Sequence, residues 1–199
     1  MAITTLNNRA INRSDTAASG QLWTATSATA SDFQAVSAGK IGQVISLTMT
    51  GKHTMSSTTA TAITDGTTTF SQAITPAATS SKILLIAHIH GHGDADSSPS
   101  FTFDRGGTNI AVATGGATNR ELGTGTLGYQ YSVHAEGINT CSMMFLDSPS
   151  TTSATTYKVE VWNADADGNN VYINRSRGNA ASPSYTDPVS TFTIMEVLA

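Results

Sequence analysis

SKILLIAHIHGH, residues 81–92, is the most apolar strand-like stretch of this 199-residue chain and indicates the fold most directly. After the apolar run ILLIA (83–87), three of the five histidines occupy every second position. Side chains at positions i and i+2 of a β-strand lie on one face, about 7 Å apart. His88, His90 and His92 are therefore expected to share one face of a strand, with the residues between them on the other.

Short stretches with strand character recur at roughly 8- to 14-residue spacing from Lys40 to the C-terminus. They are rich in Thr, Val, Ile and aromatic residues, which favour strands, and Gly, Asp and Asn between them favour turns. No segment has a convincing amphipathic-helix period. The expected strands are 42–51, 58–66, 67–75, 81–92, two around a turn at 104–107 within 100–113, a hairpin of 127–137 and 138–147, 155–164, 170–176 and 190–197.

About eight to ten short strands without helices predict an all-β protein, an antiparallel β-sandwich or jelly roll. In the last strand, 190–197, Phe192 and Ile194 alternate with Thr191, Thr193 and Met195, and Glu196 follows in the same period of two. Strands at both ends of the domain fit a fold in which the first and last strands are neighbours.

Residues 1–38 differ from the rest of the chain, because their apolar residues are scattered and small residues dominate after Thr16. Alone, such a segment cannot bury enough surface to offset the entropy of ordering it. We therefore expect an extended docking arm over 1–38 and one β domain over 39–199; a solvated arm without a partner is the alternative. The residues expected to contact the partner are Leu6, Arg9, Ile11, Arg13, Trp23 and Phe33.

The composition is poor in charge, with 12% charged residues and a net charge of −4. There is no basic run and no pattern of aromatic and arginine residues, so nucleic acid is not an expected partner. The longest apolar run, 83–87, is too short to span a bilayer, and the N-terminus lacks the apolar core of a signal peptide. We expect a soluble protein that is made in the cytoplasm and has no membrane partner.

Several stretches resemble a group of tailed-bacteriophage virion proteins. They are LNNRAINRSDTA (6–17), GQVISLTMT (42–50) followed by ITPAATSSKILLIA (74–87), SPSTTSATTYKVEVW (148–162) and TFTIMEV (191–197). The group contains small tail-fibre, head-fibre and capsid-decoration proteins with a jelly-roll domain of the tumour-necrosis-factor/C1q type. The resemblance implies a homotrimer with an N-terminal arm that attaches it to the virion and a jelly roll that faces outward.

The alternating histidines also fit a metal site, because two such side chains can bind one ion and Asp94 or His134 could complete the shell. The pattern of the jelly-roll metalloenzymes of the cupin type is not met, since Lys82 stands where that pattern has glycine. We favour a polar strand end that faces solvent or a trimer axis. No metal and no cofactor are expected.

Other candidate chemistry is weaker. No G-x-S-x-G motif is present and the four glutamates are dispersed, so no catalytic residues are expected. DADGN (165–169) lacks the distal glutamate of an EF-hand and predicts a hairpin turn, with a surface calcium site as the alternative. Trp162 and Tyr172 either pack in the core or a subunit interface, or form a sugar-stacking patch. Cys141, in an apolar stretch, is expected to be a buried structural thiol.

These observations and the resemblance predict a non-enzymatic protein of the virion surface. The leading hypothesis is a trimeric capsid cement or decoration protein, anchored by its arm to the major capsid protein or other virion subunits and stabilising the capsid. The alternative is a short tail- or head-fibre module that binds a host surface glycan. The protein would be made in the host cytoplasm.

Overall fold

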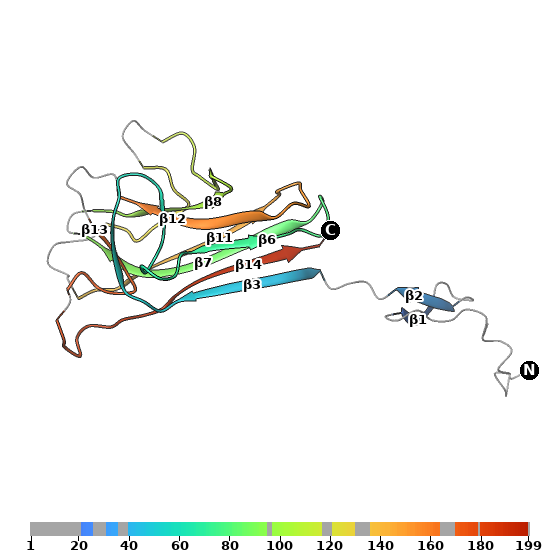
Figure 1. The fold of residues 1–199 in the computed structure, drawn as a ribbon, viewed down its shortest axis with the longest axis horizontal. Coiled ribbons are helices and arrows are strands. Elements are labelled where there is room, and N and C mark those ends of the chain that lie inside the picture. Colours follow the sequence, from blue (N-terminus) through green and yellow to red (C-terminus); the bar gives the residue numbers. More distant parts are fainter. Residues whose placement is uncertain are drawn as a thin grey trace, which may run out of the picture. The chain divides into compact units, whose positions relative to one another are not determined.

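A computed structural model describes residues 21–25, 31–35, 40–94, 97–116, 121–129, 136–163, 170–178 and 180–198. These residues contain fourteen strands and no helix, so the all-β prediction is confirmed for them (Figure 1). Nothing in this part of the chain forms a helix that could cross a membrane. The chain divides into two units, Met1–Gly39 and Lys40–Ala199, and we call the second the sandwich unit.

The first unit contains one antiparallel hairpin of β1 (Gln21–Ala25) and β2 (Ser31–Ala35). Trp23 and Phe33 are register partners in it. These two strands were not among the strands expected from the sequence, which predicted residues 1–38 to be an extended arm. Strands of only five residues are too short to reveal a period of two clearly.

One sheet of the sandwich unit is centred on β7, and we call it the β7 sheet. β11 pairs with one edge of β7. The other edge pairs with β14 along its first part and with β13 along its last part; β14 pairs further with β3, and β13 with β4. All pairs are antiparallel. The strands are β3 (Ile41–Met49), β4 (His53–Ser56), β7 (Lys82–Gly93), β11 (Asn139–Asp147), β13 (Asn170–Ile173) and β14 (Ser190–Val197).

The other sheet is centred on β12, and we call it the β12 sheet. β8 lies on one side of β12 and β5 and β6 on the other, while β9 and β10 pair with β8. The strands are β5 (Thr61–Ala62), β6 (Ser71–Ile74), β8 (Ser100–Arg105), β9 (Thr108–Ile110), β10 (Gly125–Thr126) and β12 (Thr155–Trp162). The predicted turn joins β8 to β9 through Gly106 and Gly107, which both have positive φ.

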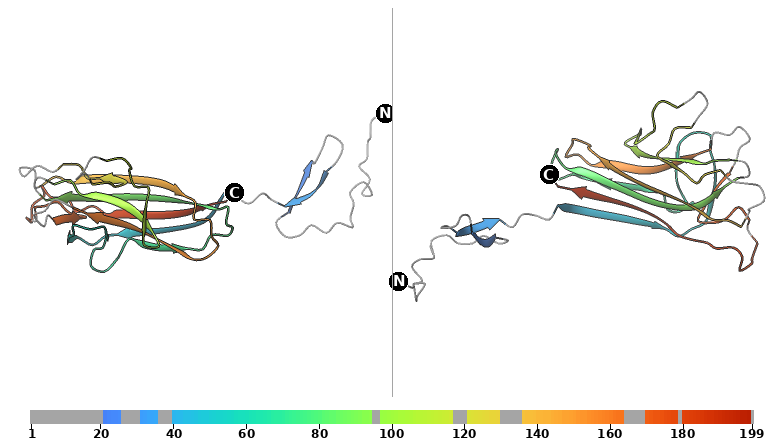
Figure 2. Two further views of the ribbon diagram at one scale, coloured as in Figure 1. Left: turned by 90° about the horizontal axis from the view of Figure 1, so that it is seen from above. Right: turned by 180° about the vertical axis from the view of Figure 1, so that it is seen from behind.

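The core lies between the two sheets, which face each other in Figure 2. The inward side of β7 is fully buried, and Phe192 of the β7 sheet contacts Phe103 of the β12 sheet, with ring centroids 6.2 Å apart. Burying a large apolar side chain contributes about 2 kcal/mol, so this layer supplies most of the driving force. The largest fully buried side chains are Tyr157, Phe70, Phe101, Phe103, Phe192, Met49, Ile63, Ile74, Ile83, Leu85, Ile89 and Ile173.

One predicted hairpin needs correction. β12 and β13, on either side of the stretch predicted as a hairpin turn, belong to different sheets, so the hairpin prediction is wrong. The apolar residues of β12 and those of β13 face the same core from opposite sheets. A period of two shows which residues of a strand face the core, but not to which sheet the strand belongs. β11 pairs with β7, and residues 130–135, which belong to the other predicted hairpin of 127–137 and 138–147, lie outside the described residues.

A buried carboxylate ties the two sheets together. Asp147, at the end of β11, is 5% exposed and accepts hydrogen bonds from Arg105 Nη1 at 2.9 and 3.0 Å and from the Tyr157 hydroxyl at 2.6 Å. Burial and the bond to Asp147 raise the pKa of the Tyr157 phenol, which stays protonated as a donor. The contact joins the end of the β7 sheet to β8 and β12.

Glu196 is another buried carboxylate, 1% exposed, on the same side of β14 as Phe192 and Ile194. It accepts hydrogen bonds from Gln43 Nε2 at 2.8 Å and from the amide of Ala77 at 2.6 Å. Burial disfavours its ionised form, but these hydrogen bonds outweigh burial and hold the pKa of the Glu196 carboxyl below its usual range. The carboxylate fastens β14 to β3 and to the segment before β7.

We expect Glu196→Gln to lower the free energy of unfolding by about 2 kcal/mol at neutral pH, because an amide group replaces one of the two accepting oxygens. A lowered pKa in the folded state means that the stabilisation is present above the unfolded pKa and is lost as the pH falls through the folded one. Urea unfolding at several pH values should therefore show the two proteins converging in acid. Glu136→Gln, at an exposed position, is the control; an equal effect of both variants would contradict the assignment.

Candidate functional site

The outer face of the β7 sheet carries a band of apolar side chains. Alternation turns every second residue of β3, β14, β7 and β11 away from the core, and the registers align these residues in rows across the four strands. One row is Val44, Met195, Leu84 and Leu146, and the next is Ser46, Thr193, Ile86 and Met144. We call the apolar members of the two rows the apolar band: Val44, Leu84, Ile86, Met144, Leu146 and Met195.

Much of this band is open to solvent. Met144 is 70% exposed, Val44 58% and Leu146 44%, and the other three members are half-buried. Single exposed apolar residues are common on protein surfaces, whereas this group is contiguous across four strands and is a candidate interaction surface. The band is therefore the strongest functional feature of the described residues.

The outer face of the β12 sheet contrasts with this arrangement, because the chain covers part of it. Ser100, Thr102 and Asp104 alternate with the core residues of β8 yet are themselves buried. The Thr102 hydroxyl donates to the carbonyl of Ile110, and the Thr124 hydroxyl donates to that of Ala111. Segments that follow β8 in the chain thus lie over this face and satisfy its polar groups.

The histidines continue the exposed face of the β7 sheet beyond the apolar band. His88 lies between Thr191 and Ser142 in the next row, and its Nδ1 is 2.9 Å from the Ser142 hydroxyl. His90 lies opposite Thr140, with Nδ1 2.9 Å from that hydroxyl. The predicted sharing of one face thus corresponds to a ladder of imidazole–hydroxyl pairs between β7 and β11.

His92 departs from this pattern. It is buried, whereas His88 is exposed and His90 is half-buried, and its Nδ1 donates to the carbonyl of Gly93. Asp94, which the sequence offered as a further metal ligand, accepts a hydrogen bond from Asn170 Nδ2, and its Oδ1 lies 3.9 Å from Arg177 Nη1. No group of three His, Cys, Asp or Glu side chains with metal-binding geometry occurs among the described residues.

Some predicted site residues cannot be placed. Leu6, Arg9, Ile11 and Arg13, and likewise His134 and the DADGN stretch, lie outside the described residues. Trp23 and Phe33 are brought opposite each other by the hairpin register. The docking role of all six arm residues stays a prediction.

The remaining candidates fall on separate elements. Trp162, half-buried, ends β12 in one sheet, whereas Tyr172 is on β13 in the other, with the Arg175 guanidinium 5.1 Å from its ring centroid. Cys141 is buried as expected, and burial raises the pKa of its thiol to about 11. Such a thiol is a poor nucleophile near neutral pH.

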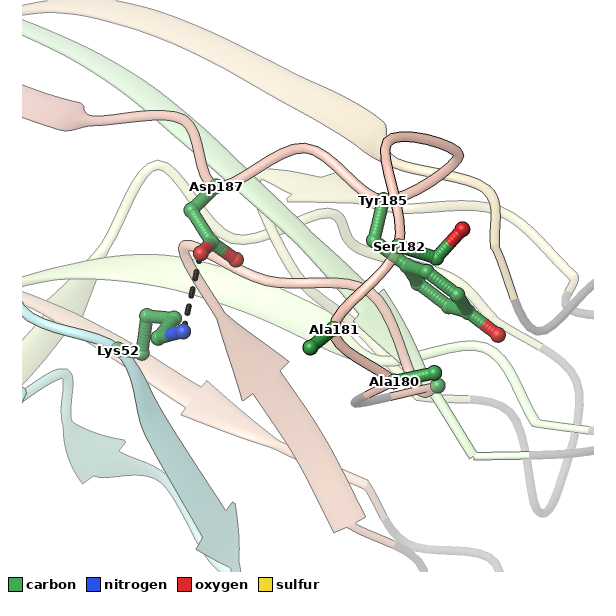
Figure 3. A pocket seen from close by; sticks show the side chains of 7 residues that line it. Lys52, Ala180, Ala181, Ser182, Tyr185 and Asp187 are labelled. Atoms are coloured by element: carbon green, nitrogen blue, oxygen red, sulfur yellow. Dashed lines mark hydrogen bonds and ion pairs between the residues drawn. The ribbon is translucent and has the colours of Figure 1, made fainter.

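A small polar hollow is lined mainly by residues of the segment between β13 and β14, and no sequence pattern predicted it. It encloses about 250 Å³ and is lined by Lys52, Gly178, Ala180, Ala181, Ser182, Tyr185 and Asp187 (Figure 3). Lys52 Nζ lies 2.9 Å from Asp187 Oδ2 at the surface. The mixture of a phenol ring, a hydroxyl group and an exposed ion pair suits a small hydroxylated ligand.

We expect chelation with EDTA to leave the melting temperature unchanged, because His88 and His90 each pair with a hydroxyl group and no ligand cluster surrounds them in the described part of the chain. A structural metal site would contribute several kcal/mol, so its removal would lower the melting temperature clearly. Calorimetry with and without EDTA, beside elemental analysis of the purified protein, measures this. A fall that added Zn²⁺ reverses would show the expectation to be wrong.

No protein-family model and no curated protein matches this chain. The part of the chain that the structure describes offers three surface features that bear on function. They are the apolar band, the histidines beside it and the polar hollow before β14.

Proposed function

We propose that this protein is a non-enzymatic structural protein of a phage virion surface, a trimeric capsid cement protein with an N-terminal docking arm. The apolar band carries the proposal. An apolar surface across four strands suits permanent burial against other subunits, and a closed cyclic trimer would bury it in every copy.

A jelly roll is the fold that we propose for the sandwich unit. Its strands would be, in chain order, β3, β6, β7, β8, β10, β11, β12 and β14. If these eight strands are numbered one to eight, strand one pairs with strand eight and strand two with strand seven. Strand three pairs with strands six and eight, and strand four pairs with strands five and seven. This interleaving supports two sheets built from Greek-key connections.

The docking arm is the second part of the proposal. A trimer displays three copies of residues 1–38, so weak contacts of each copy with neighbouring capsid subunits would combine into strong attachment. The aromatic residues Trp23 and Phe33 are the anchors that we propose in the hairpin, and Arg9 and Arg13 would pair with acidic groups on the capsid.

The alternative is a short fibre module, which the polar hollow favours. Tyr185, Ser182 and the pair of Lys52 and Asp187 offer the ring surface and hydrogen-bonding groups that a host surface glycan would contact. The hollow lies outside the apolar band, so this alternative also accommodates a trimer.

We expect Met144→Lys to convert the trimer into folded monomers, because each buried and unpaired ammonium would cost about 3 kcal/mol at the interface. Native mass spectrometry gives the oligomeric state and circular dichroism the fold. Val189→Lys, at another exposed apolar position outside the band, is the matched control and should stay trimeric. A monomeric wild-type protein would contradict the proposal outright.

We expect particles that lack this protein to lose genome on heating or osmotic shock at lower stress than wild-type particles, while they adsorb to cells normally. Added protein should restore resistance, whereas protein without residues 1–38 should not bind the particles. Normal resistance with failed adsorption would favour the fibre alternative. Full decoration by the truncated protein would contradict the docking role of the arm.

A further inference from the structure

We propose that His88 and His90 lie within the subunit interface of the trimer and make its assembly reversible by acid. This inference rests on the trimer proposed above. It gives a role to the histidine pattern, which that function leaves unexplained.

The apolar band alone is too small for a stable interface. Four strands about 4.8 Å apart and two rows about 7 Å apart cover roughly 200 Å². A specific interface buries about 800 Å² on each partner. Contacts between subunits must therefore continue beyond the band over neighbouring rows of the same face.

The strands extend from the band mainly in one direction. β7 begins at Lys82, one row before Leu84, and β14 ends at Val197 in that same row. In the other direction β7 continues from Ile86 to Gly93, and β11 accompanies it as far as Asn139. The next outward residues of the central strand are His88 and His90, so a partner that covers the band and continues along the sheet reaches both.

Neutral hydroxyl groups surround the two imidazoles. On the outer face β11 supplies Thr140 and Ser142, β14 supplies Thr191, and β3 supplies Thr48 in the row of His88. Neither histidine forms an ion pair with any described residue, so no carboxylate there compensates an imidazolium.

The other titratable or charged groups are few. β7 itself carries Lys82, at the far end of the apolar band, and the buried His92. β13 supplies Tyr172, which pairs in register with His92, and the segment after it supplies Arg175, which lies over the tyrosine ring. Two of these groups are cationic. The carboxylate that follows β7, Asp94, is hydrogen-bonded to Asn170 Nδ2 and lies 3.9 Å from Arg177 Nη1.

Acid should therefore oppose assembly. Imidazoles in general take up a proton near pH 6.5, and a buried imidazolium without a counter-charge is unfavourable. The assembled trimer, with up to six such imidazoles covered, binds fewer protons than three separate subunits. Association consequently weakens as the pH falls, by about tenfold per pH unit for each proton taken up on dissociation.

The test compares the wild-type protein with the double variant His88→Gln and His90→Gln, in which the amide groups keep a hydrogen-bonding capacity but cannot be charged. Native mass spectrometry and sedimentation between about pH 8 and pH 5 cover the range in which imidazole titrates. Circular dichroism at each pH confirms that the subunits stay folded. His53→Gln, on β4, is the matched control.

We expect the wild-type protein and His53→Gln to dissociate into folded subunits in acid, with the double variant remaining trimeric. Equal pH profiles for the wild-type protein and the double variant, or a wild-type trimer that persists across the range, would overturn the inference and leave the proposed trimer intact. A wild-type protein that is monomeric already at pH 8 would overturn both.

Discussion

The alternation of side chains along β7 is the constraint on which the rest of the structure depends. Its inward residues, among them Ile83 and Leu85, are fully buried in the core, and its outward residues form the centre of the apolar band and the start of the histidine ladder. A shift of one residue would exchange the two faces completely. Burial of the inner face therefore also sets which side chains the sheet offers to a partner.

Two buried carboxylates hold the strands beside β7 in this register. Glu196 fastens β14 to β3, and Asp147 connects the end of β11 to Arg105 and Tyr157 of the other sheet. A buried acceptor without its donors costs roughly 1–3 kcal/mol, so displaced registers of these strands are penalised. The apolar band contains residues from all four strands and keeps its shape only while these registers hold.

The sequence was sufficient for elements whose pattern is local. The period of two identified β7 and β14, and two glycines identified the turn between β8 and β9. It was insufficient where partners are distant: β12 and β13 were assigned to one hairpin although they pair in different sheets. The apolar band was missed for the same reason, because Val44, Met195, Leu84 and Leu146 become neighbours only through strand pairing.

The placement of the surface features separates the proposed roles of the sandwich unit. Its apolar band lies on the strands of one sheet, whereas the polar hollow is formed largely by the segment between β13 and β14. A trimer that uses the sheet face would leave such a segment to vary without loss of assembly, since loops tolerate substitution better than packed strands. Cement and fibre proteins could thus share one trimeric scaffold, and the contacts made by the arm and the loops would decide between the two functions.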